Sequence, residues 1–116
     1  MNAKHYVSLE VAKMLKEKGY NEECYFYYKE ADPALYHREL YNRNSERDDI
    51  ISAPTLLEAM DWLEESGIRI EILWSDNYHL WYSTIKLSIV TITEMGYYAD
   101  RNECMNETIK KGLELL

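Results

Sequence analysis

The sequence predicts an α+β fold in which helices pack on one face of a mostly antiparallel sheet of about four strands. Two observations predict it. Amphipathic helical segments occur near both ends and in the middle of the chain, and aromatic or alternating segments lie between them. The short polar connections favour hairpins, because parallel strands need long crossovers. The expected order is αββαββα, arranged as a two-layer sandwich.

The first two helices are predicted from caps and apolar spacing. Residues 9–18 form a helix that Ser8 caps and Gly19 follows. The second helix begins at Thr55, where Thr55-Leu56-Leu57-Glu58 is a capping box, and Gly67 ends it. Its apolar residues recur at helical spacing, opposite a series of carboxylates.

A third helix is predicted at the end of the chain, capped by Asp100 or Asn102. Gly112 falls on its apolar side. Glycine costs about 1 kcal/mol relative to alanine within a helix, so its position there predicts close packing against the sheet.

Extended segments separate the helices. Alternation of apolar and polar residues supports Ile68–Ser75 most clearly, and a turn at Asp76-Asn77 leads to its hairpin partner. The predicted strands are Cys24–Tyr28, an edge strand at Leu35–Tyr41, Ile68–Ser75 and Tyr78–Ile89. Residues 90–98 fit either a strand or a bend at Gly96, and the polar residues 42–49 are expected to form a mobile surface loop.

The length indicates a single domain over residues 1–116, since a chain of this size buries roughly two thirds of its unfolded surface. Cys24 and Cys104 are expected to be reduced thiols, because two distant cysteines do not form a disulfide framework. The first residues lack the apolar core of a signal peptide or membrane span. We therefore expect a cytoplasmic protein with no membrane contact.

Tyrosine occurs eleven times against one phenylalanine, which predicts aromatic surfaces whose hydroxyls remain hydrated. If Phe26 faces the helices, alternation places its neighbours on the other side of the sheet. The candidate partner-binding residues on that side are Tyr25, Tyr27, Arg69, Leu73 and Tyr82, with Thr84 beside them. Aromatic residues also favour strands through packing alone, so a purely structural role is the alternative.

The net charge of −8 disfavours nucleic acid as a partner, because the surface repels phosphates on average. Catalytic chemistry is not indicated either: His5, His37 and His79 lie in separate segments without a recognisable motif. Clustered metal ligands and phosphate-binding glycine loops are absent from the sequence. We expect no enzymatic activity, no metal and no cofactor.

Three segments resemble a group of small uncharacterised proteins of prophages and mobile elements in gut Bacteroidetes. These are Ser8-Leu9-Glu10-Val11-Ala12-Lys13, Ser52-Ala53-Pro54-Thr55-Leu56 with Ala59-Met60-Asp61-Trp62-Leu63, and the closing Ile109–Leu116. The resemblance implies a bacterial or phage cytoplasmic setting and a compact α+β fold. It brings no catalytic motif and does not extend to residues 33–49.

The combined features predict a non-catalytic protein-interaction module, acting through its tyrosine-rich sheet face on a protein partner or on a second copy. The alternative is an acidic inhibitor that imitates nucleic acid and occupies the DNA site of a host defence enzyme. A third hypothesis, an enzyme that uses Cys24 or Cys104, lacks an activating neighbour in the sequence.

Overall fold

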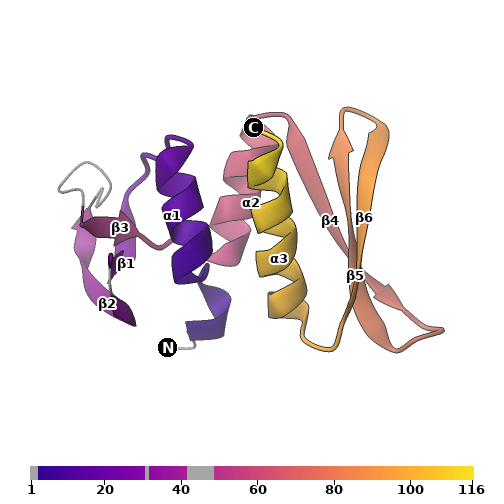
Figure 1. Cartoon of the computed structure of the whole chain (residues 1–116), viewed down its shortest axis with the longest axis horizontal. Helices are drawn as coiled ribbons and strands as arrows, with labels where there is room; N and C mark the ends of the chain where they lie inside the picture. Colours follow the sequence, from indigo (N-terminus) through magenta and orange to yellow (C-terminus); the bar gives the residue numbers. More distant parts are fainter. Residues whose placement is uncertain (1–2, 31, 42–48) are drawn as a thin grey trace. The chain divides into compact units, whose positions relative to one another are not determined.

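The computed structural model describes residues 3–30, 32–41 and 49–116. These residues have the predicted α+β composition, and the chain divides into two compact units, Met1–Thr55 and Leu56–Leu116. Each unit holds its own three-stranded antiparallel sheet (Figure 1). The expectation that residues 1–116 form a single domain stays a prediction.

The first unit consists of a helix and a sheet in which the first strand is central. Ser8 caps the helix as predicted, with its side-chain oxygen accepting from the Val11 amide at 3.3 Å, and Gly19 follows the helix with φ +92°. The strand order is β2-β1-β3. The elements are a short 3-10 helix η1 (Ala3–His5), α1 (Leu9–Glu17), β1 (Cys24–Lys29), β2 (Asp32–Tyr41) and β3 (Ile50–Ser52).

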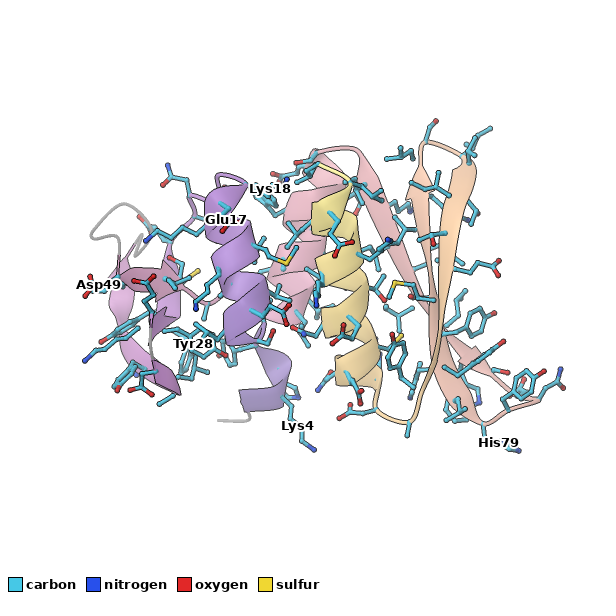
Figure 2. The ribbon with its side chains drawn as sticks, in the orientation of Figure 1. Lys4, Glu17, Lys18, Tyr28, Asp49 and His79 are labelled. Atoms are coloured by element: carbon cyan, nitrogen blue, oxygen red, sulfur yellow. The ribbon has the colours of Figure 1, made fainter. Side chains whose placement is uncertain are left out.

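Tyr28 anchors β1 within this unit. Its side chain is buried, and its hydroxyl donates to the carbonyl oxygen of Val7 at 2.7 Å (Figure 2). Val7 precedes α1 and its own amide donates to the Pro54 carbonyl at 3.1 Å. The hydroxyl therefore ties the central strand to the segment that leads into the helix.

The second unit places two helices over one face of a hairpin-connected sheet, in the order β4-β5-β6 (Figure 1). β4 has the bounds that alternation predicts, and Asp100 caps the last helix by accepting from the Asn102 amide at 2.8 Å. The region left open at residues 90–98 is a strand. The elements are α2 (Leu56–Glu65), β4 (Ile68–Ser75), β5 (Leu80–Leu87), β6 (Val90–Tyr98) and α3 (Arg101–Glu114).

The expectation of one sheet with about four strands requires correction. The described strands form two sheets, and the element order is αβββαβββα, with η1 ahead of the first helix. β1 is paired on both sides by β2 and β3, and β5 is paired on both sides by β4 and β6. Because a strand has only two edges, neither central strand can join the other sheet. The predicted loop at residues 42–49 lies almost wholly outside the described residues.

Gly112 confirms the predicted close approach of the last helix to the sheet. A Cβ atom at this position would lie 3.3 Å from Leu63 Cδ1 of α2, and 3.4 Å and 3.6 Å from Ile68 Cγ2 and Ile70 Cδ1 of β4. α3 therefore rests directly on aliphatic side chains from both a helix and a strand.

Replacing Gly112 tests this packing. We expect Gly112→Leu to lower the free energy of unfolding by about 1–3 kcal/mol, because the added carbons have no space in a packed interior. Gly112→Ala is the matched control: its gain in helix propensity of about 1 kcal/mol offsets the tight contact with Leu63. Urea denaturation of both variants measures the difference, and equal stability of the leucine variant and the parent would contradict the packing.

Alkaline pH tests the burial of Tyr28 and Cys104. Desolvation raises the pKa of Tyr28 above its ordinary 10.0 and the pKa of Cys104 above its ordinary 9.0. The folded state thus keeps protons that the unfolded state releases, so stability is constant below the unfolded values and falls as pH rises through the folded ones.

We expect Tyr28→Phe to lose about 1 kcal/mol at neutral pH with its hydrogen bond, and to show a smaller further loss above about pH 10 than the parent. Urea denaturation at intervals between about pH 7 and about pH 11 measures both effects. An alkaline decline as steep as that of the parent would show that Tyr28 does not contribute to it.

Candidate functional site

The two faces of the β4–β5–β6 sheet differ in what covers them within the second unit. On one face the Ser83 hydroxyl lies 2.6 Å from the Thr108 hydroxyl of α3, and Ile68 and Ile85 are buried. Successive side chains of a strand point to opposite faces, so their sequence neighbours lie on the other side. No helix of the second unit lies on that other side (Figure 1), which we call the open face.

Aromatic side chains gather at one end of the open face. Leu73 of β4 lies directly opposite Tyr82 of β5. The Tyr82 ring is 5.8 Å from the Tyr97 ring of β6, and the Tyr97 ring is 4.9 Å from that of Tyr78 in the β4–β5 turn. Tyr78 and Tyr97 remain 64% and 52% exposed. We call these four residues the tyrosine cluster.

Gly96 makes room for the centre of this cluster. It lies opposite Tyr82 in the sheet, and a Cβ atom on Gly96 would be 2.9 Å from the Cβ atom of Tyr82. Carbon atoms do not approach that closely without a shift of the backbone. The glycine that made the sequence ambiguous between strand and bend thus allows β6 to pass close beside Tyr82.

The other end of the open face is charged. Lys86 of β5 forms an ion pair with Glu71 of β4 at 2.6 Å, and both side chains are about one third exposed. The hydrogen bond from Lys86, followed by its charge, lowers the pKa of the Glu71 carboxyl. Thr84 lies directly opposite Glu71, and its buried hydroxyl has no hydrogen-bond partner. Arg69, which is exposed, lies opposite Lys86.

The structure brings together three of the five predicted partner-binding residues. Arg69, Leu73 and Tyr82 all lie on the open face of the second sheet, with Thr84 beside them as expected. Tyr25 and Tyr27 belong to β1 in the first unit, so they lie in a different sheet. The prediction that these residues bind a partner stays a prediction.

The surroundings of Tyr25 and Tyr27 also differ from each other. Tyr25 is 53% exposed, with its ring 6.1 Å from that of His37. Tyr27 is only 5% exposed and stacks on Tyr36 with ring centroids 5.5 Å apart. A side chain so deeply buried offers little area to a partner, whereas Tyr25 has the exposure that a contact needs.

Two members of the tyrosine cluster were not identified from the sequence. Tyr97 lies in the region that the sequence left open. Tyr78 was predicted to begin the strand Tyr78–Ile89, but β5 spans only Leu80–Leu87 and Tyr78 lies in the turn before it. The alternation of Val90, Ile92 and Glu94 with threonines is a signal for the third strand. Extending that strand past Gly96 would have placed Tyr97 beside the hairpin.

The three histidines lie in separate elements, and the described residues contain no cluster of side chains that could bind a metal ion. His5 lies in η1 and His37 lies in β2. His79 lies in the β4–β5 turn (Figure 2). Within residues 3–30, 32–41 and 49–116, no three His, Cys, Asp or Glu side chains are placed to hold a metal ion. Among the same residues, no helix is both long and apolar enough to cross a membrane.

Both cysteines are free and buried, as expected for structural thiols. Burial raises the pKa of the Cys104 thiol, and this effect exceeds the opposing hydrogen bonds from Thr108 and Ser83. A thiol held in its protonated form is a poor nucleophile. The arrangement around Cys104 therefore favours packing over catalysis.

A hollow of about 250 Å³ in the first unit is the other candidate site. Its lining consists of Lys13, Lys16, Glu17, Glu30 and Ile51. The Lys16 amine donates to the carbonyl oxygen of Ile50 at 2.8 Å, and the two lysines are balanced by two glutamates. Such a lining selects neither anions nor cations, so the open face remains the stronger candidate.

Comparison with protein-family models, with curated proteins and with solved structures finds no match to this chain. A functional interpretation therefore rests on the geometry and chemistry of the open face.

Proposed function

We propose that the protein is a non-catalytic interaction module that binds another protein through the tyrosine cluster. The main support is the contact of three tyrosine rings on a sheet face that the helices of the same unit leave uncovered. Two of these rings are more than half exposed. Tyrosine supplies rigid contact area at small entropic cost and is enriched in protein interfaces. Its hydroxyl keeps such a surface hydrated when no partner is bound.

The expected partner carries positive charge around an apolar contact. The protein has a net charge of −8, so a basic partner is attracted over a distance and oriented before contact. Nucleic acid lacks this complementarity, because binders of single strands combine aromatic rings with a positive groove. We include in this proposal the cytoplasmic location and the relation to prophage proteins that the sequence predicts. The partner would then be a bacterial or phage protein.

A second candidate function is supported by α2. Its exposed carboxylates Glu58, Asp61 and Glu65 follow one another at helical spacing, about 4.5 Å and 6 Å apart along the axis. A row of negative charges at such intervals supports imitation of a phosphate backbone, and the target would be a DNA-binding enzyme. The tyrosine cluster plays no part in this alternative.

Substitution of Tyr97 tests the first proposal. We expect Tyr97→Ser to weaken binding of the partner at least tenfold, because an exposed ring at the centre of the contact is lost. Tyr25→Ser is the matched control, since Tyr25 is 53% exposed and Tyr97 is 52% exposed, but Tyr25 lies in the other sheet. Quantitative capture from lysate of the source organism identifies proteins that the parent retains and the Tyr97 variant loses, and titration of the purified partner measures the affinities.

The outcomes separate three situations. Loss with Tyr97→Ser alone supports the tyrosine cluster, and equal loss with both variants shows that the effect is not specific to this cluster. If both variants bind every captured protein as the parent does, the tyrosine cluster is not the binding surface.

The acidic alternative makes an opposite prediction with the same assay. Replacing Glu58, Asp61 and Glu65 by glutamine would abolish binding to a DNA-binding enzyme, and the parent's affinity would fall steeply with added salt. Tyr97→Ser would leave that binding unchanged. Salt-insensitive binding, or retention of the enzyme by the glutamine variant, counts against imitation of nucleic acid.

A further inference from the structure

The outer edge of β4 is a regular strand edge that lacks a partner in the described part of the chain. β4 ends the strand order of its sheet and pairs only with β5. The pairing runs through all eight residues, from Ile68 with Leu87 to Ser75 with Leu80, without a register shift. β6, the other edge, is different, because two register shifts interrupt its pairing with β5.

An unpaired edge presents a row of amides and carbonyls to any other strand. Natural proteins protect such edges by proline, lysine, bulges or very short strands. The bulges in β6 are one of these devices. β4 is eight residues long and has no bulge, proline or lysine, and its charged side chains are Arg69 and Glu71.

The charges of β4 are arranged to complement the same strand running in the opposite direction. Consider a second β4 placed antiparallel on the outer edge, with the two-fold axis at Ile70. Arg69 of each copy then lies directly opposite Glu71 of the other, while Ile68 lies opposite Ile72. Opposed residues share a face, so the charged pairs lie on the open face and the isoleucines on the helix face.

Neighbouring registers lack this complementarity. An axis at Arg69 or at Glu71 places two like charges directly opposite each other, which is unfavourable. An axis at Ile72 places Glu71 opposite Leu73, so neither Arg69 nor Glu71 meets an opposite charge on the second copy. A shift of one strand by a single residue would place the isoleucines of one copy opposite residues of the open face of the other copy. Of the registers with an axis at residues 69 to 72, only the one at Ile70 places opposite charges directly across the strand pair.

Glu71 can take part in this pairing while it keeps its contact with Lys86. A carboxylate has two oxygens that accept several hydrogen bonds, and the Lys86 amine lies 2.6 Å from one of them, Oε1. Lys86 holds the carboxylate on the open face, where the opposing Arg69 would arrive.

We propose that the protein forms a symmetric dimer through antiparallel pairing of two β4 strands, with Arg69 of each copy opposite Glu71 of the other. The resulting sheet has six strands, and α2 and α3 of both copies cover the same face of it. The proposal rests on the interaction-module function and deepens it, because the dimer presents the tyrosine cluster twice on one surface. Two clusters give a repetitive or dimeric partner higher avidity than either cluster alone.

The predicted interface is small, because a strand pair of this length buries less than the roughly 1,200 Å² of standard stable complexes. We therefore expect association to be visible only in concentrated protein. Sedimentation velocity over a concentration series from about 10 μM to about 1 mM covers the range of affinity that such an interface supports.

Charge reversal at the two positions tests the register. We expect Arg69→Glu and Glu71→Arg each to weaken self-association at least tenfold, since each places two like charges opposite one another twice. An equimolar mixture of the two variants should form a heterodimer of about the parent's affinity, because every opposed pair again has opposite signs. The double variant R69E/E71R should regain the homodimer.

Three controls distinguish an effect of the strand register from effects of net charge or of unfolding. Glu71→Arg makes the chain less acidic, so self-association governed by net charge alone would become stronger, opposite to the expected result. Glu94→Arg makes the same change of charge on β6 and should leave association unchanged. Lys86→Gln removes the ion pair within the chain but should leave a dimer, and urea denaturation checks that every variant is folded.

A parent that remains monomeric over the whole concentration series overturns the dimer, as does a mixture of the two reversed variants that fails to associate. Neither result bears on capture of a partner through Tyr97, which a monomer can also perform. Conversely, a dimer that follows the charge rules would stand if Tyr97→Ser had no effect on binding.

Discussion

The close packing of α3 on the second sheet decides what this unit presents to its surroundings. Gly112 brings the helix within van der Waals distance of Leu63, Ile68 and Ile70, and the Thr108 hydroxyl lies 2.6 Å from that of Ser83. These contacts bury one face of β4 and β5 in the core. The two-residue period of a strand then assigns every remaining side chain to the open face. The tyrosine cluster is exposed because the aliphatic face has been taken by the helices.

Local periodicity was sufficient for single elements and insufficient for their assembly into sheets. Ile68–Ser75 has the predicted bounds, since a strand with one buried face alternates visibly. β3 was missed because Ile50–Ser52 contains only three residues, too few to define a period. This short strand occupies the second edge of β1, so β1 is a central strand of the first sheet.

The same limitation explains why the predicted binding face was only partly correct in its geometry. Alternation tells which face of its own sheet a residue occupies, but it does not tell which sheet the strand has joined. Tyr25 therefore lies in a different sheet from Tyr82, although alternation assigns a face to each of them. Leu73 and Tyr82 could be paired from the sequence because a short turn joins their strands. Contacts within a hairpin are local, and contacts between hairpins are not.

Connection length also explains why β4 lies at an edge. Both units follow a helix with three strands, yet the first strand is central in one sheet and terminal in the other. In the first unit residues 42–49 separate β2 from β3, which is enough chain for β3 to pair on the far side of β1. In the second unit only residues 76–79 and 88–89 separate the strands. Such tight turns keep consecutive strands adjacent, so the second edge of β4 stays unpaired. The outer edge of β4 is therefore available to another strand. The opposite charges of Arg69 and Glu71 favour a strand that carries the complementary charges in the matching register.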